Sequence, residues 1–314
     1  MLKQIVIVEG LSHCGKTSVI NELKKKLDHK VLVLNTPNKN DLDEIEEYFI
    51  SKVDTLDPEK DNAKIILAKS LLDGLKEEKE RISVYFDNIH ERVKKNNFPK
   101  QSTVEDYLRI NKEGIDVPYL VLFNDVNGIL IAKTLQLKAL VDLVNLFDQE
   151  VTIIVDRFIG STLVYSPIDV IHMVNNPKDY QFRTDTYTSE RDTLMGTLSR
   201  INTAHNLLKY FALTHAPVIP IFIECPVEER ARRAKAVEAN DESDKAFDEM
   251  SIELDTIMSR KYRDYLVFFA EDCACFNPDV YNFFVIPSTT VEETTKDILG
   301  ILVNKEYYRN VGAV

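Results

Sequence analysis

The chain has 314 residues, of which 44% are hydrophobic and 29% are charged, a composition usual for a globular protein with a buried apolar core. Its formal net charge of −12 argues against broad, non-specific binding to nucleic acid, because phosphates attract basic surfaces. No apolar run approaches the length of a membrane-spanning helix, and the first strand begins too early to leave room for a signal peptide. The cysteines, Cys14, Cys225, Cys273 and Cys275, match no zinc-site spacing and predict free thiols in a cytoplasmic protein.

A phosphate-binding loop follows the first predicted strand. Residues 3–9 form a short β-branched run, which is typical of a buried strand. The residues after it read Gly10-Leu11-Ser12-His13-Cys14-Gly15-Lys16-Thr17-Ser18 and fit the P-loop pattern G-x-x-x-x-G-K-[ST]. In this pattern the glycines let backbone N–H groups turn towards an anion, the lysine reaches the β- and γ-phosphates, and the next hydroxyl group binds Mg²⁺. An amphipathic helix over 16–27 adds free N–H groups and the positive end of its dipole.

The sequence therefore predicts a nucleoside triphosphate site with Mg²⁺. Lys16 is the expected phosphate-binding side chain and Thr17 an expected metal ligand. The residues expected around the phosphates are Gly10, His13, Cys14, Gly15, Lys16, Thr17 and Ser18.

The next elements predict a parallel α/β fold. A second strand over 30–34 follows the first helix, and strand, helix, strand is the beginning of a right-handed parallel unit. Ligands bind beyond the carboxyl ends of such strands, so residues 35–38 are expected near the P-loop. Across 39–118 the composition shifts towards Glu and Lys, with helical spacing at 41–49 and 71–93. We interpret 39–118 as a helical insertion or subdomain.

The clearest strand after the first covers 151–156 and ends on Asp156. It follows a long helical pattern from Ile129 to Phe147. In P-loop proteins an acid at the tip of a neighbouring strand holds Mg²⁺, directly or through water. The alternative is an ordinary cap at the strand end.

The rest of the chain continues the α/β alternation and predicts a single domain over 1–314. A second helical insertion is predicted over 166–215, with a helix at 194–213. The remaining predicted elements are a strand at 218–226, a helix at 227–239 carrying Arg230, Arg232 and Arg233, a helix at 247–271, a strand at 283–286 and a helix at 291–303.

Three stretches together resemble the thymidylate kinase family of nucleoside monophosphate kinases. Residues 7–17 look like the family's first strand and P-loop. Asp156-Arg157-Phe158-Ile159-Gly160-Ser161-Thr162-Leu163-Val164-Tyr165 is similar to its D-R-[YF]-x-x-S-[ST]-x-A-Y segment. Residues 218–293 are similar to its arginine-bearing lid, long helix and closing strand and helix, which here places a lid at 227–245.

The resemblance implies a P-loop kinase fold and transfer of the γ-phosphoryl group of ATP to the 5′-phosphate of a deoxynucleotide, with a pyrimidine such as dTMP as the first candidate. It implies that Asp156 serves the metal and the reacting centre and that Arg157 holds the acceptor phosphate. Arg232 or Arg233, with Arg230 as a further candidate, would close over the transferring group. Guanidinium forks suit phosphate oxygens, which agrees with these roles.

The resemblance also implies an acceptor site and an oligomeric state. Phe123 would stack on the base and Tyr165 would line the nucleoside pocket. Asn127 lies in this pocket region, where the family has an arginine. The partners would be small nucleotides, and a homodimer is expected because thymidylate kinases are commonly dimers.

Two other hypotheses stay open. A related kinase could act on a deoxynucleoside, or on a hydroxymethylated pyrimidine in a nucleotide or in DNA, because Asn127 would suit an acceptor that lacks the phosphate. The acidic net charge argues against DNA. A third hypothesis is a nucleotide-gated binding protein, with 39–118 as its partner surface.

Overall fold

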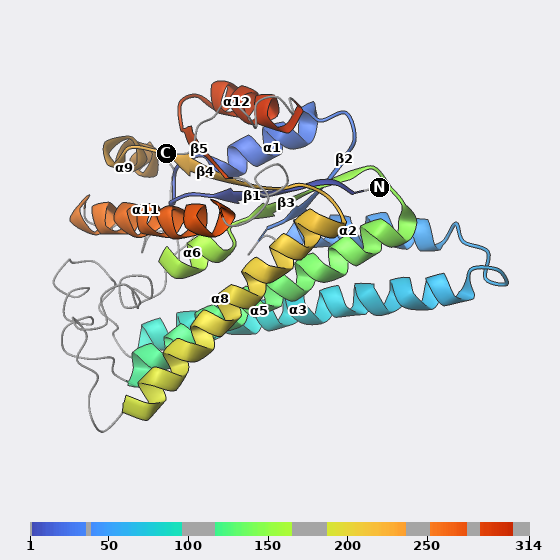
Figure 1. Ribbon diagram of the computed structural model, residues 1–314, viewed down its shortest axis with the longest axis horizontal. Helices are drawn as coiled ribbons and strands as arrows, with labels where there is room; N and C mark the ends of the chain where they lie inside the picture. Colours follow the sequence, from blue (N-terminus) through green and yellow to red (C-terminus); the bar gives the residue numbers. More distant parts are fainter. Residues whose placement is uncertain are drawn as a thin grey trace.

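The computed structural model describes residues 2–35, 39–95, 117–164, 187–236, 252–274 and 283–303. In this part of the chain a five-stranded sheet lies between two layers of helices (Figure 1). Every pair of neighbouring strands is parallel. The expected α/β fold, a parallel sheet flanked by helices, is therefore confirmed.

The P-loop strand occupies the centre of the sheet. The strands are β1 (Leu2–Glu9), β2 (Lys30–Leu34), β3 (Val151–Asp156), β4 (Val218–Glu224) and β5 (Phe284–Pro287), in the spatial order β2-β3-β1-β4-β5. Val8 of β1 pairs with Asp156 of β3, and Glu9 pairs with Phe222 of β4. Because parallel strands end at the same edge, the ends of β3 and β4 lie on either side of the P-loop.

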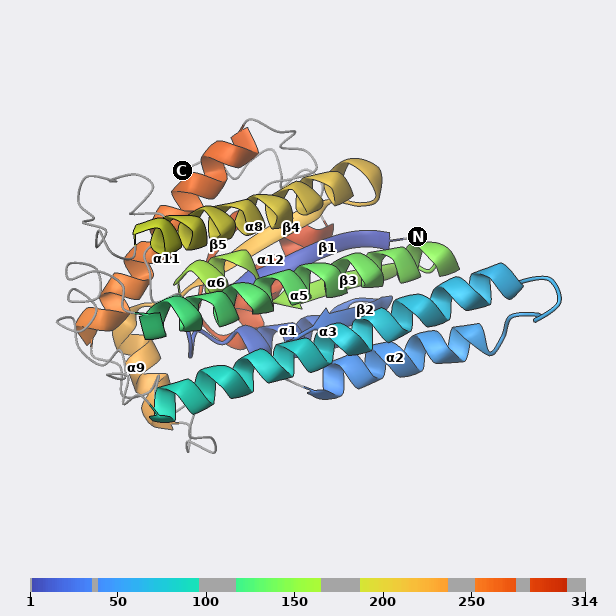
Figure 2. The same ribbon diagram turned by 90° about the horizontal axis from the view of Figure 1, so that it is seen from below.

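Helices cover both faces of the sheet (Figures 1 and 2). One face carries α1 (Lys16–Lys26) and α12 (Val291–Val303). The other carries α2 (Lys39–Val53), α3 (Asn62–Lys95), α5 (Val117–Phe147) and α8 (Tyr187–Thr214). Three helices gather near the carboxyl ends of the strands: α6 (Ile159–Val164), α9 (Val227–Ala236) and α11 (Ile252–Ala274).

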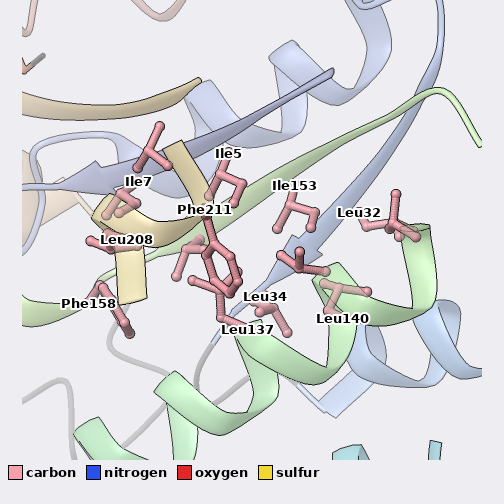
Figure 3. Packing of buried hydrophobic residues seen from close by; sticks show 14 of the residues in the cluster. Ile5, Ile7, Leu32, Leu34, Leu137, Leu140, Ile153, Phe158, Leu208 and Phe211 are labelled. Carbon is pink, nitrogen blue, oxygen red and sulfur yellow. The ribbon is translucent and has the colours of Figure 1, made fainter. Parts of the chain in front are cut away.

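The alternation of β1 side chains explains both faces. Ile5 and Ile7 join the cluster that α2, α3, α5 and α8 share, while Val6 and Val8 join the cluster of α1 and α12. Figure 3 shows the first cluster, where side chains of β1, β2 and β3 meet those of α5 and α8. A strand that is buried on both faces reads as a continuous apolar run, which is why this element is clear in the sequence.

Two helices extend further than the sequence predicts. The helix expected at 71–93 begins at Asn62, and the one expected at Ile129 begins at Val117, so it takes in 119–127. α3 and α5 pack against each other along much of their length. Gly128 permits this approach, because a Cβ there would lie 2.6 Å from Cε1 of Tyr85.

The described parts of the two predicted insertions contribute to the main core. Ile45 and Phe49 of α2 and Leu208 and Phe211 of α8 belong to the same cluster as the sheet residues. Residues 96–116, within the first predicted insertion, and 166–186, within the second, lie outside the described residues. The domain boundaries remain a prediction. Among the helices that the structure describes, none combines the length and the apolarity needed to cross a bilayer.

Candidate active site

The P-loop adopts a backbone that only glycine accommodates at two positions. Gly10 has φ of +147° and Gly15 has φ of +90°. A Cβ at Gly10 would lie 2.7 Å from the carbonyl oxygen of Ile223 and 2.8 Å from Sγ of Cys14. Gly15 is the N-cap residue of α1, so the free N–H groups of this helix begin at the loop. Backbone angles of this kind are what a P-loop uses to turn its N–H groups towards an anion, so the loop is compatible with the predicted phosphate site.

Lys16 is buried within this loop. Its Nζ donates to the carbonyl oxygen of Leu11 at 2.6 Å and lies 3.5 Å from Sγ of Cys14. Thr17 and Ser18 are exposed in the first turn of α1. The ammonium group and the exposed hydroxyl groups thus lie at the start of one helix, as the sequence pattern predicts.

Asp156 and Arg157 end β3 beside the P-loop. Asp156 is buried, and its Oδ1 has no hydrogen-bond partner among the described residues. Arg157 has φ of +61°, and its N–H donates to the carbonyl oxygen of Val8 at 3.0 Å. Its Nη2 donates to Oγ of Ser12 at 3.5 Å, which brings the guanidinium group to the rim of the loop. The fold thus places a carboxylate and a guanidinium group next to the glycine loop.

The turn after β3 is held by the carboxylate of Glu9, at the end of β1. Oε1 accepts the backbone N–H groups of Phe158 and Gly160, both at 2.9 Å. Oε2 accepts the N–H of Ser161 at 3.1 Å and its hydroxyl group at 2.6 Å. A buried carboxylate at the amino end of α6 satisfies donors that the short helix cannot pair internally.

A second link connects this turn to α11. The hydroxyl groups of Tyr262 and Ser161 lie 2.8 Å apart. The same tyrosine hydroxyl lies 3.3 Å from the carbonyl oxygen of Gly10, where the P-loop begins. The P-loop, the turn after β3 and α11 are therefore joined by one buried hydrogen-bond network.

Lys133 of α5 also contacts this turn. Its Nζ donates to the carbonyl oxygen of Asp156 at 3.2 Å and to that of Arg157 at 2.6 Å. Burial lowers the pKa of Lys133 to about 8, although the carboxylates of Asp156 and Glu9 act in the opposite direction. Backbone carbonyl groups and nearby carboxylates thus hold the ammonium group of Lys133 at the end of β3.

The structure distinguishes the three arginines of α9. Arg233 contacts the P-loop side: its Nη1 donates to Oγ of Ser288 at 2.9 Å and lies 3.5 Å from the carbonyl oxygen of His13. The side chain of Arg232 is 71% exposed, against 24% for Arg233, and forms two 2.7 Å hydrogen bonds with Glu229. Arg230 is buried and donates to the carbonyl oxygen of Cys225.

Arg230 connects α9 to α11, and Glu229 forms hydrogen bonds with Arg232 and Arg233. Arg230 pairs with Asp255 and donates to Oγ of Ser259 at 3.2 Å. Glu229 bonds to Arg232 and Arg233, and these guanidinium groups hold its pKa at about 2. In the described part of the predicted lid, Arg233 is therefore the arginine that lies against the P-loop. Residues 237–245 of the lid lie outside the described residues.

The loop after β5 completes the rim. Oγ of Ser288 donates to the carbonyl oxygen of Cys14 at 2.9 Å. Cys14 and Cys225 are free and buried, as expected for reduced thiols, and burial raises the pKa of the Cys225 thiol. Burial makes both thiols poorly reactive, and the raised pKa adds to this at Cys225.

The predicted acceptor-site residues are only partly visible. Asn127 is buried, and its Nδ2 donates to Oγ1 of Thr197 at 2.8 Å, so this side chain links α5 to α8. The backbone of Phe123 lies in α5, but its side chain is not among those described. Tyr165 lies outside the described residues.

The residues present fit ATP and Mg²⁺. The glycine cradle would accept phosphates, and Oδ1 of Asp156 is a buried oxygen that still needs a partner from outside the described residues. Mg²⁺ commonly binds through one or two carboxylates together with substrate phosphates. In the described part of the chain no three His, Cys, Asp or Glu side chains form a metal cluster. The candidate metal residues remain Thr17 and Asp156.

The sequence predicts no role for several residues that contribute to the site, among them Glu9, Lys133 and Ser288. The sequence does carry a signal for Lys133, because a charged residue interrupts the apolar stripe of a predicted core helix. Glu9 ends a strand immediately before the P-loop, and Ser288 follows β5. Their partners, however, are distant in sequence.

Comparison with known proteins finds structural likeness only. No protein-family model and no curated protein sequence matches the chain. A solved deoxyadenosine kinase from M. mycoides, with dCMP and dCDP as products, is 15% identical, with a TM-score of 0.40 and coverage of 95% of this chain and 97% of that one. A thymidylate kinase from Candida albicans is 11% identical, with a TM-score of 0.37 and coverage of 98% and 93%. At these values the likeness says nothing about what this chain binds.

Proposed function

We propose that the chain is a P-loop kinase that transfers the γ-phosphoryl group of ATP to a deoxynucleoside monophosphate, with a pyrimidine such as dTMP as the first candidate. The observation that carries the proposal is the meeting of three groups at one edge of the sheet. These are the glycine cradle with Lys16, the Asp156–Arg157 pair at the end of β3, and Arg233 on α9. Phosphoryl transfer needs alignment and charge neutralisation, and this set supplies both.

Each group has a distinct proposed task. The N–H groups from Gly10 to Thr17 and the ammonium group of Lys16 would bind the phosphates of ATP. The guanidinium group of Arg157 would hold the acceptor phosphate, and that of Arg233 would neutralise charge on the transferring group. Bound Mg²⁺ would supply further charge neutralisation, with Thr17 and Asp156 as the residues able to hold it.

A second candidate acceptor is a deoxynucleoside without a phosphate. Asn127 supports it, because an amide replaces the arginine of the resembled family and its Nδ2 is already bonded to Thr197. One fewer cation in the acceptor region would suit a neutral hydroxyl acceptor better than a dianion. The two candidates differ in substrate and share the ATP site.

The test is an ADP-release assay with ATP, Mg²⁺ and a panel of acceptors. The panel holds deoxynucleoside monophosphates, including dTMP, dUMP and hydroxymethyl-dUMP, free deoxynucleosides and modified DNA. Lys16→Ala is the loss-of-function variant, and Lys25→Ala on the exposed side of the same helix is the matched control. Turnover of a monophosphate that Lys16→Ala abolishes and Lys25→Ala retains is the expected result.

Other results of this assay would favour one of the two alternative functions. Turnover with nucleosides or DNA alone would replace the monophosphate proposal with the second candidate or its DNA variant. ATP binding without turnover on any acceptor would reject kinase activity and leave a nucleotide-gated binding protein.

A further inference from the structure

Lys133 occupies a position that packing alone does not explain. It lies on the buried side of α5, where Leu130, Ala132 and Leu137 are also buried. Burying an ammonium group among apolar side chains is unfavourable, and a methionine would fill similar space without that penalty. A charged side chain at such a position calls for a specific partner.

That partner is the backbone of the turn after β3. Nζ of Lys133 donates to two consecutive carbonyl oxygens, those of Asp156 and Arg157. In an extended strand successive carbonyl groups point in opposite directions. Here the backbone turns at Arg157, whose φ is positive, a value that residues with a Cβ adopt only rarely. In this turn both carbonyl groups face the ammonium group of Lys133.

The same turn positions the carboxylate of Asp156 and the guanidinium group of Arg157. Asp156 pairs with Val8 where β3 ends, and the turn then brings the guanidinium group of Arg157 to Ser12 on the P-loop. Val8 and Glu9 hold the N–H side of the turn, through the bonds to Arg157, Phe158 and Gly160. Lys133 holds its carbonyl side.

We propose that Lys133 is a positioning residue for phosphoryl transfer: it clamps the Asp156–Arg157 turn and so fixes the carboxylate and the guanidinium group at the P-loop. The inference rests on the proposed kinase function. Lys133 needs no contact with substrate, because its effect passes through the backbone that it binds. Displacement of a reacting or positioning group by about 1 Å can lower a rate by about 10²-fold.

The experiment compares Lys133→Met, Lys133→Arg and a matched control, Lys138→Met, on the same helix. Lys138 is an exposed lysine paired with Asp142, away from the turn. Four quantities are measured: kcat and KM for the acceptor found in the panel, the Kd of ATP in metal-free buffer, and the Kd of Mn²⁺ for the ATP-bound protein by electron paramagnetic resonance. If Lys133→Met does not fold, Lys133→Gln takes its place.

The expected pattern separates positioning from general stability. Lys133→Met should lower kcat by about 10²-fold and weaken Mn²⁺ binding by about tenfold. Its metal-free ATP affinity should change less than about twofold, since the hydrogen bonds of Lys133 within the described part of the chain go to the turn after β3 and not to the P-loop. Lys133→Arg, which keeps charge and donors, should recover part of both losses, and Lys138→Met should match the wild type.

Other patterns would overturn the inference. Wild-type kcat and Mn²⁺ affinity in Lys133→Met would show that the turn does not need the clamp. Parallel loss of metal-free ATP binding would show a general structural role instead. If the wild type turns over no acceptor, the proposed function fails and the role in phosphoryl transfer fails with it, and the Mn²⁺ comparison then decides only whether Lys133 clamps the turn. Absence of Mn²⁺ binding to the wild-type ATP complex would reject both.

Discussion

Replacing Glu9 with glutamine tests the buried network that joins the P-loop to the turn after β3. The substitution keeps the size of the side chain and replaces one carboxylate oxygen with an NH₂ group. If NH₂ replaces Oε1, it faces the two N–H donors of Phe158 and Gly160. If it replaces Oε2, it faces the N–H of Ser161 and the hydroxyl groups of Ser161 and Tyr262, which can accept. The second orientation is the less unfavourable one.

The cost follows from that orientation. The buried N–H of Ser161 loses its acceptor, which costs about 1–3 kcal/mol. The two hydrogen bonds to Oε1 change from charge-assisted to neutral, with a loss of about 1 kcal/mol each. Lower desolvation of the neutral amide offsets part of this. We expect Glu9→Gln to lower the free energy of unfolding by about 3 kcal/mol.

Urea unfolding, followed by circular dichroism, measures this change. Glu80→Gln is the matched control, because it makes the same chemical change at an exposed position of α3 and should alter stability by less than about 0.5 kcal/mol. A loss below about 1 kcal/mol in Glu9→Gln, or an equal loss in the control, would refute the assignment of the carboxylate as the acceptor that holds this turn.

The remaining predictions concern a helix contact and the lid arginines. Gly128→Ala should lower the free energy of unfolding by about 1–2 kcal/mol, because the added methyl group meets the ring of Tyr85. Gly74→Ala should raise it by up to about 1 kcal/mol through helix propensity, because a Cβ there would meet no described atom within 4 Å outside its own helix turn. Urea unfolding of both variants checks this, and equal signs would contradict it. Glu229→Gln should have a lower Tm than the wild type near pH 7, because the ionised carboxylate pairs with Arg232 and Arg233. In the wild type the pKa of Glu229 is lowered from 4.5 to about 2. The stabilisation by its carboxylate is therefore present above pH 4.5 and is lost as the pH falls towards 2. A difference in Tm that grows on acidification would contradict the assignment.

The sequence predicts best those parts of the site whose signals are local. The strand, loop and helix around Gly10 and Lys16 are contiguous, and Asp156 ends a strand that is apolar on both faces. Buried parallel strands and glycine loops have strong local patterns, so the sheet and the glycine loop between β1 and α1 can be recognised before the structure is known.

Side-chain partners that depend on tertiary contact could not be predicted in this way. Glu9 and Phe158 are 149 residues apart, and no local pattern connects them. Arg232 and Arg233 are adjacent in sequence, and their difference depends on where α9 lies relative to His13, 220 residues away.

The strand order also determines when this protein can fold during its synthesis. The central strand, β1, is made first, yet its two partners begin at Val151 and Val218. At about 5–20 residues per second, β1 waits roughly 7–30 s before β3 is made, and longer before β4 closes its other edge. Throughout that interval the ribosome carries an apolar strand with both edges unpaired, which other chains could pair with. A chain with this topology is thus expected to depend on chaperones while it is being translated, and a shortage of them should reduce its soluble yield more than its stability after folding.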